Sequence, residues 1–147
     1  MTVIHSLSQK RQEKQIKYEL NILKELSLQK IKEKIKEHFI FFFQSRILYQ
    51  AIVEETCIDH TIEAFLLGAH FSRFGFYGES IEMVHARCSN EIDELTRSLY
   101  EYIICWGKST NDDLVDESIH LTCEIFVHFW WREGYRIGKQ RHKLKLI

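Results

Sequence analysis

The stretch that decides the fold is residues 81–106, IEMVHARCSNEIDELTRSLYEYIICW. Its apolar side chains return at intervals of three or four residues, at Ile81, Val84, Cys88, Ile92, Leu95, Leu99, Ile103 and Trp106. That spacing places them on one narrow face of an α-helix. The pattern therefore predicts a single helix of about seven turns, ended by Gly107.

The same periodicity predicts helices on both sides of this stretch, over residues 8–26, 28–43 and 48–74, and a last helix opened by Asn111–Asp113. Ser27 either caps a second helix or lies inside one long helix, and the pattern leaves both readings open. Gly75–Gly78 indicates a turn, after which Ser80 suits a helix start. Gly134 and Gly138, four residues apart, indicate either a fraying helix end or a close helix crossing.

Length and composition predict one all-α domain. The chain has 147 residues, of which 45% are hydrophobic and none is proline. Long uninterrupted helices explain the missing proline better than a turn-rich β-sandwich does. We expect a single-domain bundle of four to six helices over residues 1–147, with 1–10 and 140–147 mobile. The last helix is apolar around much of its circumference, which predicts a central position.

The cysteines and the apolar runs predict a cytoplasmic protein without a transmembrane segment. Cys57, Cys88, Cys105 and Cys123 form no CxxC pair, so neither a zinc ribbon nor a disulfide framework is indicated. The longest apolar run is Phe39–Phe43, far short of the roughly 18 residues that a membrane span needs. The N-terminus contains no apolar signal core.

Charge is segregated along the chain although the net charge is −1. Residues 1–37 hold nine basic and five acidic residues, residues 38–131 hold five and fifteen, and residues 132–147 hold six and one. The basic ends either fold back on the acidic middle or point outward toward a phosphate-rich partner. Nucleic-acid binding through these ends is therefore one hypothesis, although no helix-turn-helix or aromatic–basic motif accompanies the charge.

One ridge of the expected helix 48–74 carries the strongest chemical candidates. Asp59, Glu63 and His70 lie close to a single line on that helix, and Glu55 extends the ridge. Two carboxylates and an imidazole so placed could hold a divalent metal or a catalytic water. The alternative is that the ridge is structural and pairs with arginine, the available side chains being Arg73, Arg87 and Arg97. The sequence assigns no catalytic residue and predicts no cofactor.

The aromatic residues are more numerous than one small core easily hides. Trp130 and Trp131 are adjacent, so they cannot both face the same side of a helix. Together with Phe76 and Tyr77 they are the candidates for binding a protein partner.

Two segments carry a family resemblance: residues 57–68, CIDHTIEAFLLG, and residues 74–80, FGFYGES. With Lys24–Leu28 and Phe129–Trp131, they resemble the uncharacterised YbaK-like family of bacilli, which is distinct from the tRNA-editing deacylase of the same name. The resemblance implies a bacterial cytoplasmic protein and supplies no activity, cofactor or catalytic residue. It directs attention to Asp59, Glu63 and the turn at residues 75–80, and its pattern does not require histidine at position 70.

From these observations we predict a non-enzymatic protein-interaction or regulatory module, with a protein partner or a homodimer as its assembly. Whether the protein is an enzyme stays open. The first alternative is a metal-binding or metal-dependent bundle that uses Asp59, Glu63 and His70. The second is nucleic-acid binding through the basic terminal segments.

Overall fold

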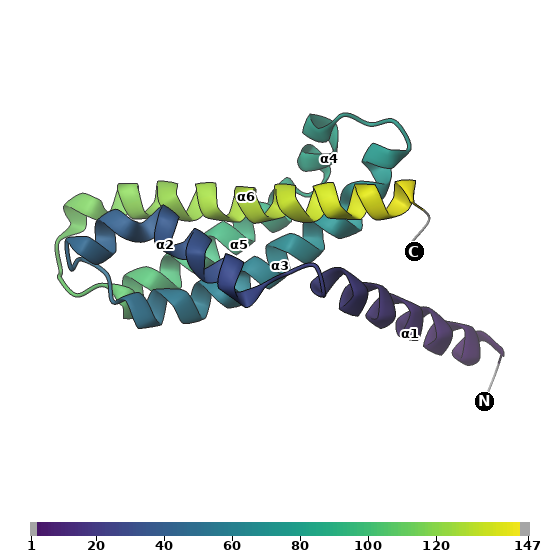
Figure 1. Ribbon diagram of the computed structural model, residues 1–147, viewed down its shortest axis with the longest axis horizontal. Coiled ribbons are helices and arrows are strands. Elements are labelled where there is room, and N and C mark those ends of the chain that lie inside the picture. Colours follow the sequence, from purple (N-terminus) through teal and green to yellow (C-terminus); the bar gives the residue numbers. More distant parts are fainter. Residues whose placement is uncertain (1–2, 145–147) are drawn as a thin grey trace.

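The computed structural model describes residues 3–144 and confirms the all-α bundle (Figure 1). The helices are α1 (Val3–Leu23), α2 (Leu28–Gln44), α3 (Gln50–Phe76), α4 (Ile81–Arg87), α5 (Ser89–Tyr102) and α6 (Asp116–Lys143). A π-helix, η1 (Ile103–Gly107), and a short 3-10 helix, η2 (Asp113–Val115), join α5 to α6. Residues 3–144 contain no strand, only an isolated bridge between Leu48 and Lys108.

The open question at Ser27 is answered by two separate helices. α1 ends at Leu23, and the Ser27 side chain caps α2 by accepting a hydrogen bond from the Lys30 amide at 3.4 Å. The break lets α1 point away from the body of the bundle, as Figure 1 shows. The expected mobility of residues 1–10 and 140–147 falls partly on residues 1–2 and 145–147, which lie outside the described residues.

The expectation of one continuous helix over residues 81–106 is wrong. The backbone leaves helical geometry at Cys88, with φ −115° and ψ 21°, so α4 and α5 are separate helices. The Ser89 hydroxyl donates to the Ala86 carbonyl at 3.2 Å, a local bond that competes with helix continuation. Five members of the apolar stripe are nevertheless buried: Val84, Cys88, Ile92, Leu99 and Ile103.

The prediction that Trp106 lies on the buried apolar face is also wrong, because its side chain is 65% exposed. The cause is the π-helix at Ile103–Gly107, whose wider turn holds an extra residue and shifts the phase of the side chains. Gly107 continues the buried stripe after Ile103 and Trp106 turns outward. Gly107 ends this segment as expected, and its carbonyl accepts a hydrogen bond from the Tyr49 amide at 2.8 Å.

The core lies where α3 and α6 cross at very close range. A Cβ atom on Gly134 would overlap the Phe65 carbonyl, and one on Gly68 would overlap the Trp131 carbonyl. Gly138 meets Ala69 in the same way, so the glycine pair on α6 marks a close crossing and not a fraying end. α6 also contacts α2 and α5, as expected of a central helix. None of the helices in residues 3–144 has both the length and the apolar composition needed to cross a bilayer.

Candidate functional site

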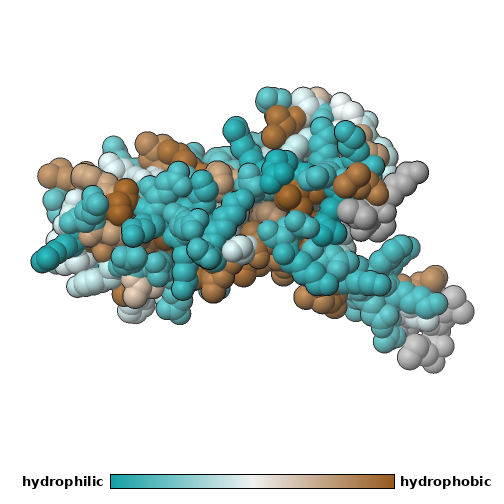
Figure 2. Space-filling model, viewed as in Figure 1, coloured by the Kyte–Doolittle hydropathy of each residue, from teal (hydrophilic) through white to brown (hydrophobic). Residues whose placement is uncertain are grey.

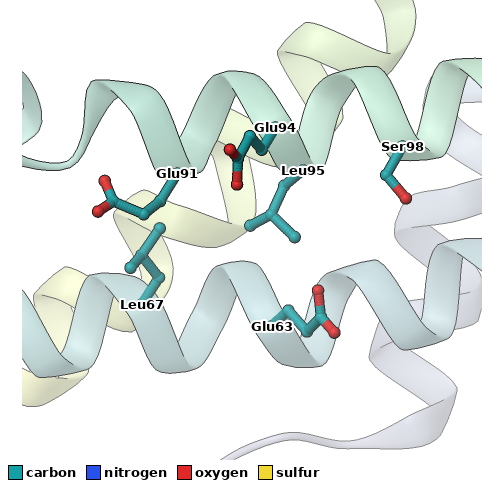
Figure 3. Close-up of a pocket in the computed structure, with 6 residues that line it drawn as sticks. All are labelled: Glu63, Leu67, Glu91, Glu94, Leu95 and Ser98. Atoms are coloured by element: carbon teal, nitrogen blue, oxygen red, sulfur yellow. The ribbon is translucent and has the colours of Figure 1, made fainter.

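Two adjoining shallow hollows form a groove along the outer side of α5, in the acidic part of the chain. Its first part, about 380 Å³, lies between α3 and α5 (Figure 3). Its second part, about 360 Å³, shares Glu94 and Ser98 with the first and ends at Cys105 and Trp106. From Glu91 to Trp106 the groove follows α5 and η1 for roughly 22 Å at a helical rise of about 1.5 Å per residue.

The groove has an apolar floor and acidic walls. Leu67 of α3 and Leu95 of α5 are half-buried and point into the space between the two helices (Figure 3). The carboxylates of Glu63, Glu91 and Glu94 stand exposed around them. Beyond Glu94 the wall continues with Glu101, and Arg97 is the basic residue of this part.

A hydrogen-bonded histidine fixes the spacing between α3 and α5 beside the groove. The His60 ring contacts the Thr56 carbonyl through Nδ1 at 2.7 Å and the Ser98 hydroxyl through Nε2 at 3.0 Å. A carbonyl oxygen can only accept, so Nδ1 carries the proton and, in the neutral ring, Nε2 accepts from Ser98. Ser98 lines both parts of the groove, and this bond ties it to α3.

The groove ends on exposed aromatic side chains, Tyr102 and Trp106. Two loops meet at this end of the bundle: the Ser109 amide donates to the Ile47 carbonyl at 2.9 Å, and the Ser109 hydroxyl bonds the carbonyls of Arg46 and Ile47. In Figure 2, hydrophobic residues at the end of the molecule where α6 begins are interspersed with hydrophilic ones. The backbone that follows the aromatic residues is therefore tied to the loop between α2 and α3.

The three candidate metal ligands do not form one site. Asp59, Glu63 and His70 are all exposed, and Glu63 alone lines the groove. Within residues 3–144 no group of three or more histidine, cysteine, aspartate or glutamate side chains is arranged to hold a metal ion. The arginine alternative is not realised among these residues either, because Arg87 pairs with Glu79 at 2.8 Å instead of with Asp59 or Glu63.

The aromatic candidates for partner binding divide into two pairs. Trp130 and Trp131 are 1% and 0% exposed, and as core residues they are withdrawn as partner-binding candidates. The reason is the central position of α6: Trp130 packs against Phe65 of α3, and Trp131 packs against His85 of α4. Phe76 and Tyr77 are exposed at the end of α3, Tyr77 by 79%. The Phe76 ring stacks on His142 with the ring centroids 5.8 Å apart.

Most of the groove lies at residues that the sequence does not single out. Glu91, Glu94 and Glu101 were counted in the acidic middle of the chain but were not placed on a common surface. The signal was present, since these residues share the polar face of α5 at helical spacings. Tyr102 and Trp106 could not be placed without knowing that the π-helix shifts the phase.

The ion pairs show what becomes of the segregated charge. In the part of the chain that the structure describes, Arg141 pairs with Glu25 and Lys30 with Glu133, so the two basic ends pair with each other. Pairs in the acidic middle are internal, such as Lys108 with Asp116 at 2.8 Å. No ion pair in residues 3–144 joins a basic end to residues 38–131. The basic ends therefore do not neutralise the acidic groove.

Fold and surface together define an all-α bundle with an open acidic groove. The full chain, residues 1–147, matches the family described as "Protein of unknown function (DUF2521)", and it belongs to that family. The protein named "Uncharacterized protein YbaK" from Bacillus subtilis (strain 168) is 31% identical over 146 residues, which cover 99% of each chain. These findings confirm the resemblance to the YbaK-like family. No solved structure matches the chain.

Proposed function

We propose that this protein is a protein-interaction module whose groove along α5 binds a basic amphipathic helix. The observation that carries the proposal is the groove itself, in which carboxylates surround the apolar floor of Leu67 and Leu95 and exposed Trp106 closes one end. An amphipathic helix that lays its apolar face into a groove is a recurring mode of peptide recognition. Here the walls select a partner helix that carries lysine or arginine beside its apolar residues.

The two ends of the groove have different roles in this proposal. Tryptophan and tyrosine are the residues that most often contribute large binding energies at protein interfaces, so Trp106 and Tyr102 act as anchors. Exposed carboxylates add little affinity each, but they steer a basic partner and fix its register. We place the interaction in the reducing cytoplasm, a location supported by Cys57, Cys88 and Cys123, which are buried as free thiols.

Site-specific photo-cross-linking in the cell tests the proposal. A benzophenone amino acid at Tyr102 preserves an aromatic ring beside Trp106, and the same amino acid at exposed Glu117 on α6 is the matched control. We expect a discrete protein adduct from position 102 that is missing from position 117. Adding Trp106→Ala to the position 102 variant should lower the adduct yield by about tenfold or more, as removal of an interface anchor does.

Either of two results would contradict this function. One is the lack of any protein adduct at position 102. The other is an adduct whose yield does not change with Trp106→Ala, because that adduct would report a chance encounter and not anchoring in the groove. The circular dichroism spectrum of each variant should match that of the unmodified chain, since Tyr102, Trp106 and Glu117 are all exposed.

A further inference from the structure

Among the residues whose side chains the structure describes, α1 contacts the bundle near its C-terminal end. The Tyr18 hydroxyl donates to the Ala69 carbonyl of α3 at 3.0 Å, Ile22 is buried, and Arg141 of α6 donates to the Asn21 carbonyl at 3.1 Å. By contrast, every residue from Leu7 to Lys17 is exposed. We call residues 7–17 the arm.

The arm presents a basic face. At about 100° per residue, Lys10, Lys14 and Lys17 lie together on one side of α1, and Leu7 borders them within about 80°. None of these lysines forms an ion pair with another residue in the described range 3–144. In Figure 2 the face of α1 that is visible is mostly hydrophilic.

The arm and the groove are complementary in charge and in spacing. Lys10 and Lys17 are seven residues apart on α1, as Glu94 and Glu101 are on α5. Seven residues correspond to about 10.5 Å along a helix. Two helices lying side by side can therefore bring both lysines opposite the two glutamates at the same time. The carboxylates of Glu91, Glu94 and Glu101 form no ion pair within residues 3–144 and are available.

The arm cannot reach the groove of its own chain while α1 stays attached. α1 leaves the bundle beside Ala69 and runs away from α5 (Figure 1). Moving it back would break the hydrogen bonds of Tyr18 and Arg141 and expose Ile22. A groove on another molecule is accessible without any such change.

We propose that two copies of this chain form a dimer in which each places its arm in the α5 groove of the other. This rests on the proposed function and names the partner as a second copy. Exchange in both directions uses the same surfaces twice, so the assembly closes with two-fold symmetry and leaves no arm unpaired. Nucleic acid is the competing partner for a basic arm, but the uncompensated carboxylates of the same molecule repel phosphate.

The first measurement is the mass of the purified full chain by light scattering and sedimentation, at increasing concentration. We expect a dimer, with twice the 17.7 kDa of one chain, at about 50 mM salt, and dissociation toward monomer at about 500 mM salt because screening weakens the charge pairs. Reversing the arm with Lys10→Glu, Lys14→Glu and Lys17→Glu should weaken dimerisation by about 100-fold or more.

A charge swap between arm and groove is the decisive test. The groove variant Glu91→Lys, Glu94→Lys and Glu101→Lys should also be monomeric, because its basic arm meets a basic groove. Mixing the arm variant with the groove variant should restore a dimer, since each arm then faces a groove of opposite charge. The matched control, Lys32→Glu with Lys36→Glu, reverses exposed lysines of α2 and should leave the dimer unchanged.

The outcomes separate this proposal from the proposed function. A strict monomer at every concentration and salt, or a dimer that both triple variants leave intact, overturns the arm exchange. If the chain is monomeric but still forms the Trp106-dependent adduct, the groove binds another protein and only the choice of partner was wrong. If the arm variant loses only RNA binding, with salt-dependent affinity, the arm serves nucleic acid and the exchange is also overturned.

Discussion

At the scale of single residues, the glycines at the α3–α6 crossing matter most. Gly68, Gly134 and Gly138 each face backbone atoms of the opposing helix, with no room for a Cβ. A backbone carbonyl cannot rotate away as a flexible side chain can, so any larger residue must push the helices apart. From the sequence, a close helix crossing at Gly134 and Gly138 is one of two alternatives, and nothing in the sequence pattern indicates that Gly68 lies opposite them.

We predict that Gly134→Ala lowers the free energy of unfolding by about 2 kcal/mol or more, even though alanine favours helix by about 1 kcal/mol. Gly107→Ala is the matched control, because its new Cβ would meet Ile103 and Val53 at 3.5 Å, an ordinary contact distance. We expect a change of less than about 1 kcal/mol there. Urea unfolding followed by circular dichroism measures both, and equal stabilities would contradict the tight crossing.

At the scale of elements, α4 is held against α6 by a pair of stacked histidines. The rings of His85 and His128 lie with centroids 4.9 Å apart, and the edge of Trp131 meets His85 at 5.2 Å. His85 Nε2 is buried without a hydrogen-bond partner among the described residues. Burial is the main cause that lowers the pKa of His85. The charges of His128 and Arg132 lower this pKa further, whereas Asp93 raises it.

This arrangement predicts a loss of stability in acid. The unfolded chain takes up a proton at His85 near the ordinary pKa of about 6.5, and the folded chain does so only at lower pH. The free energy of unfolding is therefore unaffected by His85 above about pH 6.5 and decreases as the pH falls below that value. Burial also lowers the pKa of His38 and His142, which add to the same trend.

The test compares urea unfolding between about pH 7.5 and pH 5 in three chains. His85→Gln should remove part of the acid loss, by less than about 1 kcal/mol because solvent screens the half-exposed ring. Ser118→Ala, at an exposed site on α6 that carries no titratable group, should leave the pH dependence unchanged. If His85→Gln keeps the full pH dependence, the stacked pair does not resist protonation.

At the scale of the whole molecule, periodicity predicted the helices but not the two irregularities inside residues 81–106. Five residues of the stripe between Val84 and Ile103 were correctly assigned to the core, because burial follows the helical period. The break at Cys88 and the π-helix at 103–107 preserve that burial, so the pattern could not reveal them. The groove escaped prediction for a related reason: it depends on which polar faces become neighbours, as Glu63 and Glu91 do, and that is a tertiary property.

One continuous core also predicts how the chain unfolds. Buried residues of all six helices pack into a single cluster that extends from Ile22 to Tyr135. Tryptophan fluorescence, which reports Trp130 and Trp131 in that core, and far-ultraviolet circular dichroism should therefore give the same urea midpoint. Two separated transitions would show that the chain is not the single domain predicted from its length.

The attachment of α1 would set the geometry of the proposed dimer. The carbonyl that holds the arm belongs to Ala69, while Leu67 and Glu63 of the same helix border the groove. The place where one arm leaves its molecule and the place where the other arm arrives are thus only two to six residues apart on α3. In the proposed exchange, α3 would therefore carry both junctions, the one that an arm leaves and the one at which the other arm arrives, on one rigid helix.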